Sequence, residues 1–530
     1  MTHFYLTYLR PVNYVILAYF VALGLFYLVL YGSAALETRR HLREVRAAQY
    51  SGVLSSEMVP AISMLVPAHN EEASIEQSIR ALLTVAYPQL EIVVVDDGST
   101  DGTLSVLAST FGLVPVEPIY EAHVDTQPVR AIYRSRDFPH LVVVSKDKGG
   151  KADALNAALN IASGTLVCSM DADTILDPDG LRRLVWPFIH SDDVVAAGAT
   201  IRVANGCTVM KGRLATERGP HRALAGIQAV EYLRAFLFGR PGWNRLGGNL
   251  LISGAFGLFR RQSLLDTEGY ANTVGEDMEL VVRLRRHGYE TGQPARVEFV
   301  TDPVAWTETP TSFRELGHQR ERWQRGFSDV LWRHRGVFMN PRYGMLGMVV
   351  LPAFVLFEWM APIIEALGLV LVTVGLILGL VSTLFAVLFF SLACGVGILL
   401  SMLALMLEEL SFRRYGRARD RALLVLWAVL ENLGYRQLTV WWRLRGIASY
   451  LRGKKSWGKM RRKGFAPAGA PTPAPAAGAA VALPVAPAGR PLGVAAFAPP
   501  SDSTPSVRLL GGPGRRLQAA RPFRPLRPLR

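Results

Sequence analysis

The stretch Ile92-Val93-Val94-Val95-Asp96-Asp97-Gly98-Ser99 sets the fold class of this chain. Its β-branched residues predict a buried strand, and the acids and glycine after them predict the turn that ends it. Further apolar runs alternate with helical patterns, which predicts an α/β domain with a mainly parallel sheet covered by helices on both faces. The other runs are Ile62–Val66, Leu141–Val144 and Thr165–Ser169, and the helical patterns are Glu71–Leu83, Thr103–Ser109 and Lys151–Ala162.

Composition narrows the class of protein further. Half of the 530 residues are hydrophobic, and the formal net charge is +15. Such a charge suits nucleic acid, anionic lipid or an anionic substrate. The basic residues cluster directly after apolar runs, as at Arg39–Arg46 and Lys454–Lys463, which favours lipid and argues against a nucleic-acid binder. The three cysteines form no CxxC pair, so neither a zinc site nor a disulfide framework is indicated.

Several apolar segments are long enough for membrane helices. Pro11–Leu36 is uncharged, and the basic residues after it favour an anchor with its N-terminus outside over a cleaved signal peptide. Ala366–Leu407 is uncharged and can form two spans with a turn near Gly379–Thr383. Leu346–Ile364 and Ala422–Trp442 contain charged residues, so for each of them a span and an interfacial helix stay open.

These segments predict a multi-pass protein of the inner (plasma) membrane with its α/β domain in the cytoplasm. The expected parts are an N-terminal transmembrane helix (1–36), a basic linker (37–59), the α/β domain (60–335), membrane or interface helices with at least two spans (336–445), a basic juxtamembrane segment (446–465) and a disordered Ala/Pro/Gly-rich tail (466–530).

Two motifs follow predicted strands at the edge where α/β sheets bind ligands. Val66–Glu72 contains Pro67, Ala68 and Glu71; it opens a helix whose free N–H groups suit a nucleotide, and a plain helix cap is the alternative. Asp96-Asp97 places a carboxylate where it can accept from a uracil N–H or a ribose hydroxyl, whereas an Asp-Gly turn needs only one acid.

Two further motifs point to phosphate and metal chemistry. Lys146–Lys151 has three lysines and two glycines before a helix, which suits a diphosphate cradle or, alternatively, an exposed basic turn. Asp171-Ala172-Asp173 ends an apolar strand. Regular alternation would point its carboxylates to opposite faces, but a turn beginning at Asp171 would let both approach one Mg²⁺ or Mn²⁺ ion.

The last motifs suit an acceptor. Asp277, in Gly275-Glu276-Asp277, is a candidate general base at a helix start, where dipole and capping chemistry is the alternative. Ser253–Phe256 is a small turn that either contacts an acceptor or begins a strand. Gln319, Arg322 and Trp323 share one helix face, so Arg322 can neutralise a diphosphate and Trp323 can stack on a sugar; an interfacial aromatic anchor is the alternative.

In this order the motifs resemble those of membrane-bound family 2 glycosyltransferases of the processive polysaccharide-synthase type, such as cellulose, hyaluronan and poly-N-acetylglucosamine synthases. The resemblance covers roughly residues 10–410. It implies a GT-A fold, a UDP-sugar donor, a divalent cation (Mg²⁺ or Mn²⁺) and inversion at the anomeric carbon. The implied partners are the donor, a polysaccharide acceptor, the lipid bilayer and export or accessory subunits.

The resemblance also implies roles for individual residues. Asp97 would bind uridine with Pro67, Ala68 and Glu71 nearby, and Lys151 would lie by the diphosphate. Asp171 and Asp173 would form the Asp-x-Asp pair, with Asp173 the direct metal ligand. Asp277 would be the catalytic base with Glu276 beside it, and Ser253, Gly254, Gln319, Arg322 and Trp323 would line the acceptor end.

The implied reaction is transfer of a hexosyl or N-acetylhexosaminyl group to a growing polysaccharide, processive and coupled to export. Two alternatives stay open. Transfer of one sugar to a lipid-linked or short acceptor is the first, and Gln319–Trp323 argues against it. A non-catalytic membrane scaffold or receptor is the second, and the intact acids Asp97, Asp171, Asp173 and Asp277 argue against it.

Overall fold

The computed structural model describes residues 10–48, 59–172, 174–210 and 213–454. All of them belong to the first of two compact units, Met1–Ala488. Asp173, the tail 466–530 and most of the juxtamembrane segment 446–465 lie outside the described residues, so the expectations for them stay expectations.

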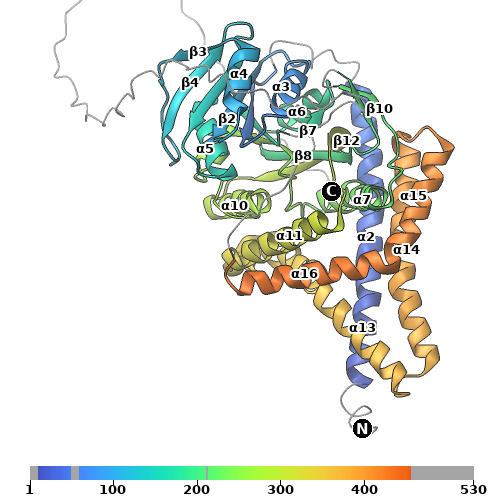
Figure 1. Ribbon diagram of the computed structural model, residues 1–530. Helices are drawn as coiled ribbons and strands as arrows, with labels where there is room; N and C mark the ends of the chain where they lie inside the picture. The colour runs from blue at the N-terminus through green and yellow to red at the C-terminus, as the bar shows by residue number, and fades with distance from the viewer. Residues whose placement is uncertain (1–9, 49–58, 173, 211–212, 455–530) are drawn as a thin grey trace, which may run out of the picture. The chain divides into compact units, whose positions relative to one another are not determined.

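A ten-stranded sheet forms the centre of the α/β part, in the order β3-β4-β5-β2-β1-β6-β11-β8-β12-β7 (Figure 1). Its strands are β1 (Ile62–Ala68), β2 (Leu90–Asp97), β3 (Leu113–Val116), β4 (Val129–Ser135), β5 (Leu141–Lys146), β6 (Leu166–Met170), β7 (Thr174–Leu176), β8 (Val194–Val203), β11 (Phe256–Arg260) and β12 (Arg296–Thr307). A separate hairpin pairs β9 (Thr208–Met210) with β10 (Arg213–Thr216).

The four central strands, β5, β2, β1 and β6, are parallel, so their carboxyl ends meet at one edge. Their register sets Ala68 beside Asp96, and Asp97 beside Lys146. Outside this core most pairs are antiparallel, including β11 with both β6 and β8. The α/β fold class is thus as predicted, but the sheet is mixed, and the expected parallel order holds for its centre. The alternation of strand and helix patterns that predicted a parallel sheet covers only the first half of the α/β domain.

Helices cover both faces of the sheet. One face packs against α3 (Ile75–Leu82), α4 (Thr103–Phe111) and α6 (Gly180–His190). The other face packs against α5 (Lys151–Ile161) and α10 (Glu276–Thr291). Burial of β-branched strand residues between these layers is the main favourable term in the fold.

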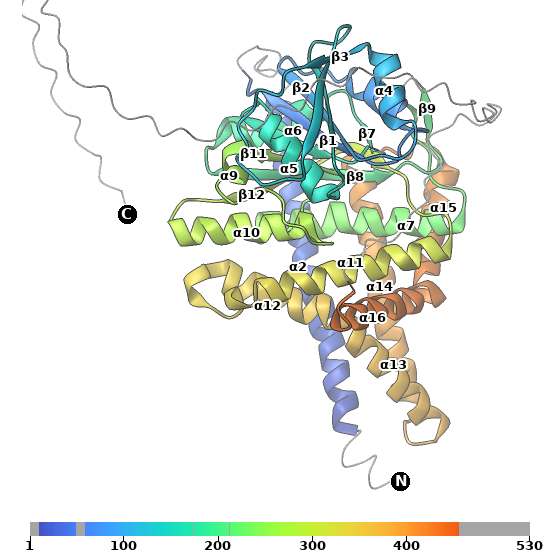
Figure 2. The ribbon, with the colours of Figure 1, turned by 60° about the vertical axis from the view of Figure 1, so that its left-hand side comes forward.

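A further group of helices lies between the sheet and the segments that could cross a membrane (Figure 2). It contains α7 (Ala223–Leu233), a π-helical turn η3 (Arg234–Gly239), α8 (Arg240–Arg245) and α11 (Phe313–Arg333). The short helix α9 (Arg261–Leu265) follows β11, and 3-10 and π-helical turns (Arg335–Val337, Pro341–Tyr343, Leu346–Val350 and Val355–Trp359) with α12 (Leu351–Phe354) follow α11.

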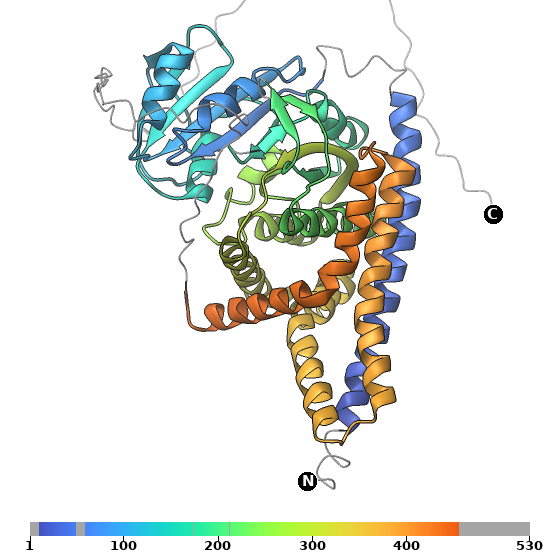
Figure 3. The same cartoon turned by 45° about the vertical axis from the view of Figure 1, so that its right-hand side comes forward.

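By length and composition, three helices in the described residues could cross a membrane: Pro11–Glu44, Leu346–Ile377 and Thr383–Ser411. The first lies within α2 (Arg10–Ala48), the second ends with α13 (Ala361–Ile377), and the third is α14. Ile16, Phe20, Val372 and Phe389 pack together, so the three helices contact one another (Figure 3).

The ambiguous segment Ala422–Trp442 is not among these three. It divides between α15 (Ala418–Leu430), a π-helical turn η8 (Glu431–Tyr435) and α16 (Arg436–Leu451), with non-helical backbone at Leu433 and Gly434. Gly446 of α16 lies against the backbone of Glu321, so α16 packs along α11. Two charges of the segment pair with neighbouring helical elements, since Glu431 pairs with Arg234 and Arg436 pairs with Glu365 of α13.

Candidate active site

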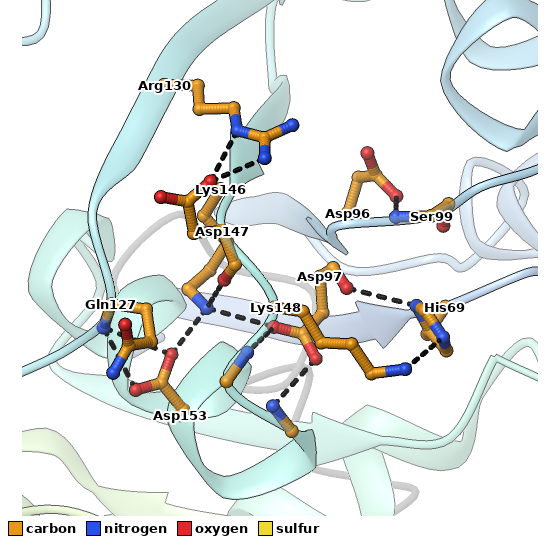
Figure 4. A network of polar contacts seen from close by, with 12 residues as sticks. His69, Asp96, Asp97, Ser99, Gln127, Arg130, Lys146, Asp147, Lys148 and Asp153 are labelled. Atoms are coloured by element: carbon orange, nitrogen blue, oxygen red, sulfur yellow. Dashed lines mark hydrogen bonds and ion pairs between the residues drawn. The ribbon is translucent and has the colours of Figure 1, made fainter.

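Asp97, at the end of β2, holds the loop that leads into α5. Its Oδ1 accepts from Lys146 Nζ at 2.9 Å and from Gly149 N at 2.8 Å, and its Oδ2 accepts from Gly150 N at 2.8 Å (Figure 4). Gly150 has a φ of +97°, which favours glycine. Lys146 is fully buried and also pairs with Asp153 in α5. Asp97 is therefore the anchor of the loop that precedes Lys151.

The hydrogen bonds of Asp97 concern its expected role as a uridine-binding residue. Both oxygens of Asp97 already accept hydrogen bonds from the loop. The neighbouring Asp96 accepts from Ser99 N at 3.2 Å, and burial raises the pKa of its carboxyl. Uridine binding by Asp97 stays a prediction.

Asp97→Asn is expected to destabilise the protein, because an amide cannot accept from all three donors and it removes one anion from a buried lysine. Loss of one partner of a buried pair costs about 3 kcal/mol, which a thermal melt in detergent detects. Asp147→Asn is the matched control, since the Asp147 pair with Arg130 is exposed and worth under about 1 kcal/mol. Equal melting temperatures for the two variants would contradict the anchoring role.

Lys151 gathers three motifs that lie far apart in the sequence. It opens α5, and its Nζ lies 2.8 Å from Asp171 Oδ1 at the end of β6 and 3.3 Å from Glu276 Oε1 at the start of α10. It also donates to Gly254 O at 3.2 Å. The carboxyl ends of the parallel strands and the first turn of α10 therefore meet at one cation.

The electrostatics of this cluster follow from burial and charge. Burial alone would lower the pKa of Lys151, but the carboxylates of Asp171 and Glu276 outweigh it and raise that pKa above its ordinary value. Burial raises the pKa of Glu276 to about 7, against the opposing effect of Lys151. The site is thus a buried, hydrogen-bonded set of charges, which is typical of catalytic centres.

Asp277 lies at the edge of the same cluster. Its Oδ2 accepts from Gly254 N at 3.2 Å, and its Oδ1 accepts from Met278 N at 2.8 Å in the first turn of α10. A small hollow is lined by Lys151, Ser253, Gly254, Tyr270, Glu276 and Asp277. Ser253 and Gly254 form the turn before β11, which begins at Phe256, so one turn both starts the strand and contacts Asp277.

The three residues Gln319, Arg322 and Trp323 lie on α11 and do not line this hollow. Trp323 is 43% exposed, and the guanidinium of Arg320 lies 4.4 Å from its ring centre. Arg320 also pairs with Glu231 of α7 at 2.6 Å.

Helix α11 is nevertheless tied closely to α10. A Cβ added at Gly275 would lie only 3.1 Å from the backbone of Gly326, so the two glycines allow the helices to touch. The start of α10, with Asp277, is therefore held directly against the helix that carries Trp323.

Pro67 and Ala68 end β1 and lie beside Asp96, as expected for the nucleotide edge. Glu71 follows in a turn, where its N–H donates to Thr103 Oγ1 and its Oε2 accepts from Ser74 Oγ. Helix α3 begins at Ile75 rather than at the predicted Glu71. The contacts of Glu71 with Ser74 and Thr103 organise that turn, which resembles the capping alternative.

The expected metal site is only partly described. Thr174 N donates to Asp171 O at 3.1 Å, which closes the turn that begins at Asp171. Among the described residues no group of three or more His, Cys, Asp and Glu side chains could hold a metal ion. The carboxylate oxygens at hand, of Asp171 and the adjoining Glu276, are nevertheless the hard ligands that Mg²⁺ and Mn²⁺ prefer.

Sequence reasoning missed two cations. It placed Lys146 in a diphosphate cradle or, alternatively, an exposed basic turn, although Lys146 is fully buried, and it did not single out Arg240 of α8, whose charge interacts with Asp277. A signal for Arg240 exists in hindsight, because a lone arginine stands within the apolar run Phe236–Trp243.

The sheet and the acids at its parallel edge define the class of this protein as a GT-A-type α/β transferase domain joined to membrane helices. The model of the family "Glycosyltransferase like family 2" matches residues 60–326, just over half of the chain. The chain belongs to this family, and it is a glycosyltransferase.

Relatives with similar sequences include poly-beta-1,6-N-acetyl-D-glucosamine synthases. The one from Staphylococcus aureus (strain COL) is 26% identical over 309 residues, which is 58% of this chain and 64% of the relative. The one from Staphylococcus epidermidis is 26% identical over 279 residues, 52% of this chain and 57% of the relative. The match thus spans less than two thirds of each relative.

Solved structures with similar folds are more distant. A mannosyltransferase from Pyrobaculum calidifontis in complex with GDP-Man and Mn²⁺ matches with 19% identity and a TM-score of 0.46, covering 79% of this chain and 99% of that one. A glucosyl-3-phosphoglycerate synthase from Mycobacterium tuberculosis matches with 20% identity and a TM-score of 0.34, covering 53% and 82%.

Proposed function

We propose that this protein is an inverting membrane glycosyltransferase that adds sugars from a UDP-sugar to the hydroxyl end of a growing polysaccharide. One observation carries the proposal: Lys151 lies within 3.3 Å of both Asp171 and Glu276, next to Asp277. This joins an expected phosphate-binding cation, the first acid of the Asp-x-Asp motif and a candidate base at one point.

The chemistry follows from these groups. Asp277 removes the proton from the acceptor hydroxyl, which then attacks the anomeric carbon from the face opposite the nucleotide. The Gly254 N–H donates to Asp277 Oδ2, which helps hold the carboxylate in place. The Lys151 ammonium counters the charge that develops on the departing UDP. Because Lys151 is held by two carboxylates, it is in place before the substrate binds.

A divalent cation fits this scheme. Asp171 would hold it, together with Asp173 if the resemblance applies, and it would neutralise charge on the diphosphate.

The acceptor end is assigned to Gln319, Arg322 and Trp323. The ring of Trp323 is partly exposed, with Arg320 over it, which suits stacking on a sugar. Processive elongation and export through the membrane helices belong to this proposal. With three crossings, the α/β domain and the loop after Ser411 both lie in the cytoplasm, as the basic residues around 413–421 favour.

The test uses membrane vesicles with Mg²⁺ or Mn²⁺ and a panel of UDP-sugars, and follows UDP release and product length. UDP-N-acetylglucosamine is the first donor to try, because the relatives named above make an N-acetylglucosamine polymer. We expect a long polymer from one donor and loss of turnover when the metal is chelated.

The alternatives give different results in the same assay. UDP release with only short or lipid-linked products would show single-sugar transfer. Metal-dependent UDP binding without turnover for any donor would indicate that an accessory subunit is required. No UDP binding at all would contradict the enzyme and favour a scaffold.

A further inference from the structure

Arg240 is a partly buried cation whose charge interacts with the candidate base Asp277. It is the first residue of α8 and directly follows the π-helical turn η3. Such turns are frequent at functional sites because they redirect side chains. Its Nη1 is buried and makes no hydrogen bond within the part of the chain that the structure describes. A buried guanidinium nitrogen without an acceptor is costly unless a ligand supplies one.

The plane of the guanidinium is held from one side. The central carbon of the Arg240 guanidinium, Cζ, lies 3.7 Å from the ring centre of Phe236, one turn earlier. Phe236 is itself buried in the main core of the domain. The other face and the unpaired nitrogen of Arg240 are thus presented in a defined orientation, as a binding group requires.

The surroundings of Arg240 connect the two halves of the proposed site. Among the charged groups, Asp277 has the strongest electrostatic interaction with Arg240. The phenol of Tyr232 also interacts electrostatically with Arg240. The same phenol acts on Arg320, which lies over Trp323. Arg240 and Tyr232 therefore belong to a chain of interacting groups that leads from Asp277 through Arg320 to Trp323.

Arg240 lies on a helix that packs against α2, one of the helices that could cross a membrane. Helix α8 packs on α2, and a Cβ added at Gly242 would lie 2.5 Å from Leu30 O. The nucleotide side of the site is built instead from strand ends and α5, where Lys151 already serves as the cation. Arg240 therefore stands on a different element of the site from Lys151, the cation of the nucleotide side.

From these observations we propose that Arg240 binds hydroxyl groups of the acceptor saccharide and positions the attacking hydroxyl at Asp277. The proposal rests on the glycosyltransferase function proposed above and adds a residue to its acceptor site. A guanidinium suits this task because its planar fork of donors can engage two neighbouring sugar oxygens at once.

The test compares Arg240→Gln and Arg240→Lys with Arg245→Gln, a control on the same helix whose side chain is half exposed and 3.8 Å from Glu37. Vesicles receive UDP-N-acetylglucosamine and a short β-1,6-linked N-acetylglucosamine oligosaccharide. KM is measured for each substrate, together with slow hydrolysis of the donor by water. Arg240→Gln is expected to raise the oligosaccharide KM about 10- to 100-fold, with donor KM and hydrolysis unchanged. The oligosaccharide KM of Arg240→Lys is expected to lie between those of the wild type and Arg240→Gln.

Other outcomes overturn the inference. Wild-type oligosaccharide kinetics in both Arg240 variants would show that it does not contact the acceptor. A higher donor KM with slower hydrolysis would assign Arg240 to the diphosphate. Thermal melts of the purified variants check folding, and unfolding of both would make Arg240 a structural residue. Absence of both transfer and UDP binding in the wild type, with every donor of the panel above, would instead refute the proposed function itself.

Discussion

Asp277→Asn is expected to lower the rate of sugar transfer about a thousandfold while nucleotide binding stays within about threefold of wild type. The amide keeps the shape of the side chain and can still accept from Gly254 N, so the turn at Ser253–Phe256 stays in place. It cannot take a proton from an acceptor hydroxyl. The loss therefore falls on the chemical step rather than on binding.

The measurement is UDP release under saturating donor, paired with the dissociation constant of UDP in the presence of Mn²⁺. Asp266→Asn is the control, because Asp266 is exposed at the end of α9 and only accepts from Gln262. If Asp277→Asn kept more than about a tenth of the wild-type rate, another group would have to be the base.

Arg202→Met is expected to have the largest effect on stability, about 3–5 kcal/mol. Arg202 lies in β8 with 1% of its side chain exposed, and it pairs with Glu217 at 3.2 Å and with Glu408 at 2.5 Å. Its guanidinium also lies over the ring of Tyr415. Without it, two buried carboxylates face each other at the junction between the sheet and the end of α14.

Thermal melts in detergent test this expectation, with Arg421→Gln as the control. Arg421 lies 3.8 Å from Glu409 in an exposed pair and donates to the backbone carbonyls of Tyr415 and Gly416, so its loss is expected to cost only about 1 kcal/mol. The double variant Arg202→Met/Glu408→Gln removes one of the two stranded charges and is expected to recover part of the loss. A melting temperature for Arg202→Met equal to that of Arg421→Gln would refute the role of this ion pair.

Much of the fold could be predicted from local sequence. The strands β1, β2, β5 and β6 were expected within about two residues of their bounds, because buried parallel strands are continuous β-branched runs. The start of α10 and the turn before β11 were expected for a similar reason, since short-range signals mark them. The later strands, β8 and β12, pair across long separations, and no local pattern reports such partners.

For the site, the sequence predicted which residues take part but not their surroundings. Residue types at strand ends and helix starts marked Lys151, Asp171 and Asp277 as candidate site residues, and the structure brings the first two together. The environment of each group was not predictable. The sequence pattern of Lys146 fits a phosphate cradle or an exposed turn, whereas β2 and α5 enclose it, and no motif marks Arg240. Burial and partners depend on tertiary packing, which a single sequence does not contain.

The length of α2 has a consequence for how the enzyme senses its surroundings. The helix has 39 residues, about 58 Å, whereas the hydrocarbon of a bilayer is about 30 Å thick. Its C-terminal part carries Glu37, bonded to Asn244, and His41, which lies 2.5 Å from Asp302 of β12. A thicker or thinner bilayer changes the tilt of such a rod. A change of lipid composition is therefore expected to act on the contacts that join α2 to Asn244 and to β12.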